Sequence, residues 1–359
     1  MKLSKVKNHF ASELLDWYHQ VCYEFPWRNV NDPYAIWLSE VMLQQTRVST
    51  VIPYYKRWIS IFPDIQSVAN SNLDIILKQW EGLGYYARAR NFHRACQISV
   101  NLYDGDIPHK PTEFSKLPGV GPYISAAVMS IAFNVPVPAI DVNTIRVVSR
   151  LNSIKLPYPK SKKNIYSLCL KLIDSNRPGE FNQAVMDLGR EICTPNNPSC
   201  YVCPVKNHCS AHLNNVVAKY PVKVKKTRAP HYYVAVGIIW KNNRILISKR
   251  NESGMLGGLW EFPGGKIKIG ETSPDCVIRE VQEELDVLVS PIFHAKRVKH
   301  AYSHFSITMD AYHCQFKGGT PRPLGCSDFR WVFPHEIQKM AFPSASRKLF
   351  DSIKEAVAS

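Results

Sequence analysis

The segment LPGVGPYISAA, residues 117–127, decides the fold of the longer part of this chain. Gly119 and Gly121 permit a tight turn, because glycine adopts backbone conformations that other residues avoid. The apolar residues that follow predict a helix, whose first backbone amides can face a phosphate. Asp141 lies twenty residues beyond Gly121, in AIDVNTIRVVSR. It can cap a helix beginning near Val142, so its side chain has a structural use as well as a chemical one.

Outward from this segment, the sequence predicts two domains. Residues 1–214 have apolar side chains at helical spacing and no convincing alternating strand. Residues 215–231 have no helical face and predict a basic interdomain linker, with Lys219, Lys223, Lys225, Lys226 and Arg228. Residues 232–359 begin with two β-rich runs joined at 241–243, which predicts a hairpin, and a helix is expected at 273–285. This second domain is therefore expected to be α+β.

The charge balance indicates a polyanionic partner. The chain has 359 residues, 45 lysines and arginines and 29 acidic residues, for a formal net charge of +16. Such an excess favours nucleic acid through release of counterions, although an ordinary basic protein has the same property. The N-terminal residues lack an apolar core and a cleavage site, and no run reaches the roughly 20 apolar residues that span a bilayer. We expect a cytoplasmic protein with no membrane partner.

Four of the ten cysteines form a compact cluster with the spacing C-x6-C-x2-C-x5-C. They are Cys193, Cys200, Cys203 and Cys209. Zinc sites usually separate two C-x2-C pairs by a longer segment, so the short unequal gaps favour an iron-sulfur cluster, with zinc as the alternative. The isolated cysteines are interpreted as core or surface residues, namely Cys22, Cys96, Cys169, Cys276, Cys314 and Cys326.

The glycine turn, Asp141 and the cysteine loop 193–209 together resemble the endonuclease III superfamily of base-excision glycosylases. The run SEVMLQQT, residues 39–46, is similar to the signature of one branch, the MutY adenine glycosylases. The resemblance implies an all-α helix-hairpin-helix glycosylase domain with a 4Fe-4S cluster, followed by a Nudix-like domain. It also implies a monomer that removes adenine mispaired with 8-oxoguanine or guanine in double-stranded DNA, close to the nucleoid if the source is bacterial.

Two carboxylates account for the expected chemistry. Breaking an N-glycosidic bond builds positive charge on the sugar, which a nearby carboxylate such as that of Asp141 can stabilise. Adenine leaves readily only when protonated, so a second carboxyl group with a raised pKa is expected. The resemblance assigns this role to Glu40, which would protonate adenine at N7. A solvated glutamate on a helix surface is the alternative, but the apolar neighbours of Glu40 in the sequence argue against it.

The resemblance also implies a set of residues that bind DNA or the flipped base. Flipping is required because chemistry on a base cannot occur inside the stack. The implied residues are Trp27 and Arg28 around adenine, Gln45 and Thr46 beside the oxidised guanine, Leu83 and Tyr85 as a wedge, and Gly119 and Gly121 at the phosphate. Core packing is a serious alternative for Tyr85. Bifunctional relatives have a catalytic lysine where this chain has Tyr123, so cleavage without a Schiff base is expected.

The C-terminal part contains a nearly complete Nudix box, GLWEFPGGKIKIGETSPDCVIREVQEELDV, residues 258–287. Glu280, Glu283 and Glu284 have a spacing that places them on one helix face, where their carboxylates are candidate ligands of Mg2+. The nearby run RVKHAYSHFSITM, residues 297–309, resembles the MutY loop that reads the lesion, with His300, Tyr302, Ser303 and His304. An alternating β-strand is the plainer interpretation of this run.

Two other functions stay open from the sequence. The first is a nucleotide pyrophosphatase fused to a helical DNA-binding domain, which the intact glutamate pattern of the box favours. The second is a lesion-binding module without catalysis. Release of free adenine that Asp141→Asn abolishes with binding retained would exclude the second, whereas loss of all release in a Glu271, Glu280 or Glu284 mutant would favour the first. The glycosylase interpretation requires Glu40 and Asp141 to share a cavity wide enough for a purine.

Overall fold

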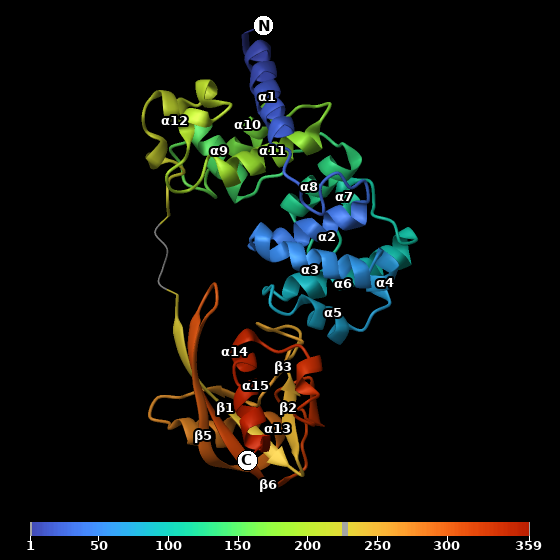
Figure 1. Ribbon diagram of the computed structural model, residues 1–359, viewed down its shortest axis with the longest axis vertical. Helices are drawn as coiled ribbons and strands as arrows, with labels where there is room; N and C mark the ends of the chain where they lie inside the picture. The colour runs from blue at the N-terminus through green and yellow to red at the C-terminus, as the bar shows by residue number, and fades with distance from the viewer. Residues whose placement is uncertain (1, 225–228, 359) are drawn as a thin grey trace. The chain divides into compact units, whose positions relative to one another are not determined.

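The structure, a computed structural model, describes residues 2–224 and 229–358 and divides the chain into two compact units (Figure 1). The first unit comprises Met1–Asn70 and Asn91–Lys226, and the second comprises Ser71–Arg90 and Thr227–Ser359. The units do not follow chain order, because Ser71–Arg90 lies in the stretch predicted to be helical and yet clusters with the C-terminal residues. Among the helices that can be described, none is long and apolar enough to cross a membrane.

The first unit is built from helices, as the apolar spacing predicted. No strand occurs before His231 in the part of the chain that the structure describes. The helices are α1 (Lys2–Val21), α2 (Pro33–Leu43), α3 (Val48–Ile61), α4 (Ile65–Ala69), α7 (Pro111–Phe114), α8 (Pro122–Phe133), α9 (Val142–Leu151), α10 (Lys162–Leu172), α11 (Pro178–Glu191) and α12 (Ser210–Leu213), together with α6 (Ala87–Tyr103) from Asn91 onward. Short 3-10 turns lie at Cys200–Val202, Lys206–His208 and Val217–Lys219.

Helix α2 forms the centre of this unit. Asp32 caps its first turn by accepting a hydrogen bond from the Tyr34 amide (2.9 Å), and Pro33 occupies the first helical position, where its missing amide costs nothing. Every residue from Tyr34 to Met42 is buried. An α-helix that is buried on all sides must pack against neighbours all round, and α2 contacts both α3 and α8. A glutamate on such a helix is necessarily enclosed by protein.

The predicted glycine turn joins α7 to α8. Gly119 has φ +79°, and a Cβ at this position would lie 2.9 Å from the Cβ of Asn91, so both conformation and space require glycine. Gly121 caps α8 in an extended conformation that other residues also adopt. At the next turn Asp141 caps α9 through a bond from the Thr144 amide, which confirms the predicted helix start at Val142.

The second unit contains one mixed sheet with the strand order β3-β2-β1-β6-β5. Its strands are β1 (His231–Lys241), β2 (Arg244–Lys249), β3 (Trp260–Glu261), β4 (Gly264–Lys266), β5 (Val287–Ala301), β6 (Ser306–Gly319) and β7 (Asp328–Val332). Strands β1 and β2 form the predicted hairpin, because Asn242 and Asn243 both adopt positive φ, as the commonest two-residue turn requires. β1 also pairs in parallel with β6.

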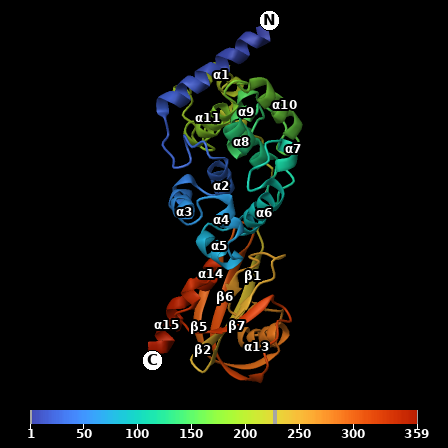
Figure 2. The same ribbon diagram turned by 90° about the vertical axis from the view of Figure 1, so that its right-hand side faces the viewer.

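Helices cover both faces of this sheet, with α13 on one side and α14 and α15 on the other (Figure 2). Ala235 and Ile239 of β1 face α13 (Ser273–Leu285), whereas Val236 and Ile238 face the core that includes α14 (Ser344–Arg347) and α15 (Phe350–Ala358). The predicted helix at 273–285 therefore matches α13. A helical domain followed by an α+β domain is confirmed as the fold class.

The predicted linker is described only in part. Its Lys225, Lys226 and Arg228 lie outside the described residues. Of the remainder, Val217–Lys219 forms a 3-10 turn and His231 already belongs to β1. The chain therefore enters the sheet of the second unit soon after residue 228. It does so through β1, which occupies the middle of the strand order.

Candidate active site

The first unit contains a cavity of about 430 Å³, which lies in the range of roughly 300 to 1,000 Å³ of small-molecule sites. Several helices contribute to its wall, from the loop before α2 to the end of α11. Its lining residues are Trp27, Arg28, Ile36, Ser39, Glu40, Leu43, Thr46, Arg47, Val48, Ser49, Tyr123, Ile131, Asp141, Asn143, Gln183, Met186, Asp187 and Arg190. The two predicted carboxylates, Glu40 and Asp141, therefore share one cavity.

Glu40 is almost completely enclosed, with 6% of its surface exposed. Its Oε2 accepts a hydrogen bond from the hydroxyl of Tyr123 on α8 (2.6 Å). Burial raises the pKa of the Glu40 carboxyl, and the negative charge of Asp141 adds to the rise, while the bond from Tyr123 and the charge of Arg28 oppose it. The solvated-helix alternative for Glu40 is therefore wrong. A buried carboxyl group with a raised pKa is suited to donate a proton.

Asp141 has both carboxylate oxygens engaged. Oδ1 accepts from the Thr144 amide (2.6 Å), and Oδ2 accepts from the Asn143 side-chain amide (2.7 Å). These two bonds fix the orientation of the carboxylate at the N-terminus of α9, where the helix dipole favours a negative charge. Among the residues that the structure describes, no cationic side chain bonds directly to this carboxylate. This is the arrangement that a group needs if it is to stabilise a cationic sugar.

A hydrogen-bonded path leads from Asp141 to the cysteine loop. Asn143 Oδ1 accepts from Nη2 of Arg146 (2.7 Å), and Nε of Arg146 donates to the Cys193 carbonyl (2.7 Å). Nη2 of Arg146 also reaches the Gly189 carbonyl (2.6 Å). A Cβ at Gly189 would lie 2.6 Å from the Cβ of Asn143, so the glycine permits α9 and α11 to approach closely. The orientation of Asn143 is thus set from two elements.

Residues of α11 form one wall of the cavity, and our sequence interpretation missed them. Asp187 forms a two-bond pair with Nη2 of Arg28 (3.0 and 3.1 Å), and Gln183 accepts from the same guanidinium. Tyr18 accepts from Nη1 of Arg28 (3.0 Å). Gln183 and Asp187 are four residues apart and share a helix face. A buried aspartate in an amphipathic helix, FNQAVMDLGR, was the signal that could have identified this wall.

The other residues predicted near adenine and DNA have separate settings. Trp27 lines the cavity, is 7% exposed, and packs edge-on against Tyr55 with ring centroids 5.3 Å apart. Thr46 lines the cavity too. Gln45 does not, and its exposed side chain extends from a residue with φ +57° in the turn after α2. These positions bring Trp27 and Thr46 to the two carboxylates and leave Gln45 at the surface.

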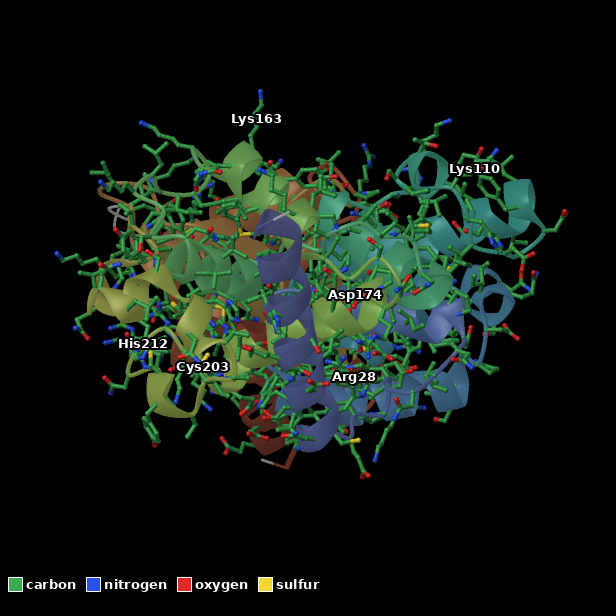
Figure 3. All side chains as sticks on the ribbon, turned by 90° about the horizontal axis from the view of Figure 1, so that it is seen from above. Arg28, Lys110, Lys163, Asp174, Cys203 and His212 are labelled. Carbon is green, nitrogen blue, oxygen red and sulfur yellow. The ribbon has the colours of Figure 1, made fainter. Side chains whose placement is uncertain are left out.

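The four clustered cysteines surround one small cavity together with Arg150 and His212. Figure 3 labels Cys203 and His212, which lie in the same region of the first unit. Nη1 of Arg150 donates to Sγ of Cys193 (3.2 Å) and to the Thr194 carbonyl (2.7 Å). Four thiols that line one small cavity, with a cation beside them, match the all-cysteine donor set of an iron-sulfur cluster. Of the isolated cysteines, Cys22 is exposed and the others are buried.

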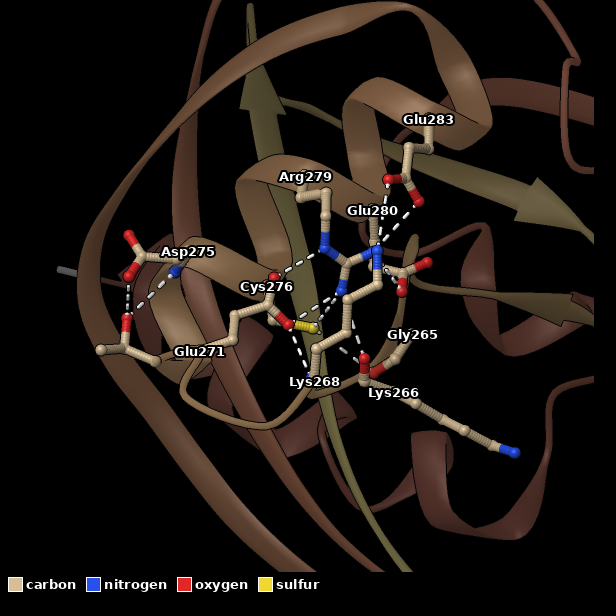
Figure 4. Close-up of polar contacts among 10 residues, drawn as sticks. Gly265, Lys266, Lys268, Glu271, Asp275, Cys276, Arg279, Glu280 and Glu283 are labelled. Atoms are coloured by element: carbon tan, nitrogen blue, oxygen red, sulfur yellow. Dashed lines mark hydrogen bonds and ion pairs between the residues drawn. The ribbon is translucent and has the colours of Figure 1, made fainter.

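The Nudix box in the second unit is held together by Arg279 (Figure 4). Its guanidinium bonds to both carboxylate oxygens of Glu271 (2.6 and 2.9 Å), to Glu280 (2.8 Å) and to Glu283 (3.0 Å). The bond from Arg279 lowers the pKa of Glu271 to about 2. A Cβ at Gly265 would lie 2.2 Å from the carboxylate carbon of Glu280, so a larger residue here would displace the Glu280 side chain.

The arrangement of these carboxylates does not fit a Mg2+ site. Glu280 and Glu283 are directed to Arg279. Burial raises the pKa of Glu284 to about 8, so this third carboxyl is largely protonated at neutral pH. Within the described residues, no three His, Cys, Asp or Glu side chains converge in a group that could hold a metal ion. This holds for the four cysteines as well, whose thiols line one cavity without forming such a group.

The run 297–309, which is predicted to read the lesion, includes the connection between β5 and β6. His300 belongs to β5, and Tyr302, Ser303 and His304 form the tip, closed by a bond from the Tyr302 amide to the Phe305 carbonyl (2.8 Å). Tyr302 stacks on Phe305, whereas Ser303 and His304 are exposed. The alternative of one continuous strand is wrong at this tip, although both flanks are strands. The wedge residues Leu83 and Tyr85 belong to the same unit, and Leu83 is buried.

Comparison with protein families gives two matches along the chain. Residues 38–174 match the HhH-GPD superfamily of base excision DNA repair proteins, and residues 235–352 match the NUDIX domain. The first range includes Glu40, Tyr123 and Asp141, and the second includes the box that Arg279 organises. Both matches therefore cover the sites described above.

Individual relatives resemble most of the chain. An adenine DNA glycosylase of Rattus norvegicus is 32% identical over 402 residues, which cover 96% of this chain and 78% of that protein. An adenine DNA glycosylase of Buchnera aphidicola is 39% identical over 260 residues, covering 71% of this chain and 73% of that protein. Among solved structures, a thermostable thymine-DNA glycosylase superimposes with a TM-score of 0.55 at 28% identity, covering 59% of this chain and 98% of that chain.

Proposed function

Because the chain belongs to the adenine DNA glycosylase family, we propose that it is a monofunctional enzyme that hydrolyses the N-glycosidic bond of adenine opposite 8-oxoguanine or guanine in double-stranded DNA. The observation that carries this proposal is the shared cavity of Glu40 and Asp141. An acid that protonates the base and an anion that faces the sugar must act on the same nucleotide, so they must border one space.

Glu40 is the proton donor in this mechanism. Its raised pKa favours the protonated form, and its proton passes to N7 of the flipped adenine as the glycosidic bond lengthens. Trp27 and Arg28 border the base, and the pair between Arg28 and Asp187 holds the guanidinium in a fixed orientation. Protonated adenine is a far better leaving group than the neutral base.

Asp141 stabilises the positive charge that develops on the deoxyribose. Its carboxylate is oriented by the Thr144 amide and by Asn143, so little reorganisation is needed when the charge appears. Tyr123 lies where bifunctional relatives have a lysine, and no lysine occurs among the residues that line the cavity. Without an amine no imine with C1′ can form, and water completes the reaction while the DNA backbone stays intact.

The cysteines Cys193, Cys200, Cys203 and Cys209 would hold a 4Fe-4S cluster whose role is to fold the loop that follows α11. The bonds from Arg146 and Arg150 to Cys193 tie this loop to α9. The cluster therefore supports the position of Asp141 without taking part in the chemistry. Gly119 and Gly121 present the amides of the turn before α8 to a phosphate of the DNA.

In the second unit, the tip formed by Tyr302, Ser303 and His304 reads the oxidised guanine. The exposed Ser303 and His304 offer hydrogen-bonding groups, and the stacked pair of Tyr302 and Phe305 gives the tip a fixed shape. Gln45 wedges beside the oxidised guanine, Thr46 contacts that base, and Tyr85 enters the stack. We favour this role over nucleotide hydrolysis, because Glu271, Glu280 and Glu283 bond to Arg279, and the described residues of the box form no group that could hold a metal ion.

The decisive experiment is single-turnover release of adenine from duplexes with adenine opposite 8-oxoguanine or guanine. Asp141→Asn should abolish release and keep DNA binding, since asparagine also caps a helix well. Asp174→Asn is the matched control, because Asp174 likewise accepts backbone amides (2.8 and 3.0 Å) but lies outside the cavity lining. Release that persists in Asp141→Asn contradicts the proposed mechanism. A parallel test of nucleoside triphosphate hydrolysis with Mg2+ addresses the pyrophosphatase alternative, which substantial turnover would support.

A further inference from the structure

The segment Ser71–Arg90 belongs to the second unit, although both of its chain neighbours belong to the first. It consists of α5 (Leu73–Trp80), a loop, and the first turn of α6. Glu81 is the residue that ends α5, and its carboxylate is 5% exposed. A carboxylate is rarely buried unless its charge is paired, so the partners of Glu81 indicate what the segment is fastened to.

Both oxygens of Glu81 bind groups from the segment 340–347. Oε1 accepts from the Phe342 amide (2.9 Å), and Oε2 accepts from Nη1 of Arg347 (2.9 Å) and from Nζ of Lys78 (2.7 Å). Lys78 also donates to the Met340 carbonyl (3.1 Å). Lys78 and Glu81 therefore bind the backbone of residues 340–342 at both ends, at the Met340 carbonyl and at the Phe342 amide.

This backbone is itself part of the core of the unit. The Ala341 carbonyl accepts from the Trp260 amide of β3 (2.9 Å), and Phe342 is fully buried between Phe262 and Phe350, with ring centroids 5.4 and 5.2 Å away. A displacement of Glu81 would have to move this packed segment or break three charge-assisted bonds. Glu81 thus connects α5 to a buried part of the core of this unit.

Two further contacts hold the ends of the segment. Asp74, in the first turn of α5, pairs with Lys249 of β2 (2.6 Å). Arg90 donates from Nη1 to the Gly257 carbonyl (2.6 Å). Glu81 lies between them in sequence, and its side chain is 5% exposed, compared with 32% for Asp74. The carboxylate of Glu81 is therefore the less accessible of the two to water.

The loop that follows Glu81 is stabilised by contacts among its own residues. Arg88 lies over the rings of both Trp80 and Tyr85 (5.2 and 5.5 Å to the centroids) and donates to the Leu83 and Gly84 carbonyls (3.2 and 3.1 Å). Tyr85 has φ +49°, a strained conformation for a tyrosine that these contacts hold. Because the loop is rigid, the position of its tip follows the position of Glu81.

The tip of this loop meets the tip between β5 and β6. The ring of Tyr85 faces the ring of His304 edge-on, with centroids 6.2 Å apart and an interplanar angle of 77°. The intercalating residue and the lesion-reading residue therefore belong to one unit and touch each other. Their relative position depends on how Ser71–Arg90 is held.

We propose that Glu81 is a positioning residue for lesion discrimination, which fixes the Leu83–Tyr85 loop against the His304 tip so that both read the same base pair. This inference rests on the proposed role of the tip in reading 8-oxoguanine. It predicts that the preference for 8-oxoguanine over guanine opposite adenine depends on a carboxylate that touches neither the DNA nor the cavity of Glu40. Adenine release from the guanine mispair depends on Glu40 and Asp141 and is affected much less.

The test measures single-turnover rates on both duplexes for Glu81→Gln, which keeps the shape of the side chain and removes its charge. The ratio of the two rates should fall about tenfold or more, the size expected when hydrogen bonds to a charged group are lost. Arg347→Met should lower the same ratio, Arg347→Lys should restore most of it, and Glu81→Gln with Arg347→Met should lose little more than either alone. Glu355→Gln, an exposed glutamate of the same unit, is the matched control.

An unchanged ratio in folded Glu81→Gln overturns the inference. If Glu81→Gln does not fold, Arg347→Met decides, because Arg347 is half exposed and its loss is tolerated more easily; an unchanged ratio in that variant overturns the inference equally. A wild-type enzyme that releases adenine equally fast from both duplexes contradicts the proposed reading of 8-oxoguanine and removes the inference with it. A wild-type preference that both variants retain contradicts the inference alone.

Discussion

Replacing Tyr123 with phenylalanine tests the proton donor directly. The substitution removes the hydroxyl that donates to Oε2 of Glu40 (2.6 Å) and keeps the ring. This bond stabilises the carboxylate form, so its loss should raise the already elevated pKa of Glu40 further. A hydrogen bond to a charged group contributes about 1.5–3 kcal/mol, which corresponds to roughly one to two pH units at 1.36 kcal/mol each.

The direction of the change follows from the role of Glu40 as an acid. Its active form is protonated, so the rate of adenine release falls as pH rises through the pKa of the folded enzyme. In Tyr123→Phe this falling limb should move to higher pH by about one to two units. The height of the plateau is a separate readout, because Tyr123 also borders the cavity where the sugar is expected.

The assay is the pH dependence of single-turnover adenine release, with binding of the same duplex measured at each pH. Tyr55→Phe is the control, since Tyr55 is a buried tyrosine of the same unit that packs on Trp27 but does not line the cavity. Its falling limb should coincide with that of the wild type. A limb that stays in place or moves to lower pH in Tyr123→Phe refutes the assignment of this bond to the acid.

Four further predictions follow from the same contacts. Tyr123→Lys places an amine beside the expected sugar position, so borohydride should trap protein on DNA, and trapping no greater than wild type contradicts this placement. Arg146→Met breaks the path from Asn143 to the cysteine loop and should lower the rate about tenfold or more with the fold intact, as seen by circular dichroism. Cys203→Ser should reduce bound iron and the melting temperature together, and full iron content would contradict its role as a ligand. Glu284 has its pKa raised to about 8 by burial, so its contribution to stability is present at acidic pH and is lost as pH rises toward 8; Glu284→Gln should flatten this dependence in thermal melts.

Local sequence signals predicted much of the fold because they depend on few residues. Asn242 and Asn243 predicted a hairpin because the turn needs two residues with positive φ, and both have it. Asp141 was expected to cap α9, and it does, because a cap is decided within three residues. The helix at 273–285 followed from apolar spacing and matches α13. Each of these signals is complete within a short window.

The contribution of α11 to the cavity wall could not be predicted from any short stretch of the sequence. Gln183 and Asp187 bind Arg28, which lies 155 and 159 residues away in the chain. The helical pattern of FNQAVMDLGR shows that Asp187 is on a largely apolar face, and this indicates only that it has a partner. The partner is decided by how α11 packs beside α1. The SEVMLQQT run was informative for a different reason, since a family resemblance carries the contacts along with the residues.

The placement of Ser71–Arg90 shows the same limit at the scale of domains. Its apolar spacing predicts a helix correctly, and Ile76, Leu77 and Trp80 are buried as an amphipathic helix requires. The same pattern would suit a helix that packs against the core of either unit. The core is specified by a polar residue, because the carboxylate of Glu81 can be buried only where donors bond to it. The Phe342 amide and the Arg347 guanidinium are such donors, and they lie more than 250 residues away in the chain. A buried charge therefore specifies a bonding partner, which apolar spacing does not. For this reason the neutral variant Glu81→Gln tests most directly how the segment Ser71–Arg90 is held.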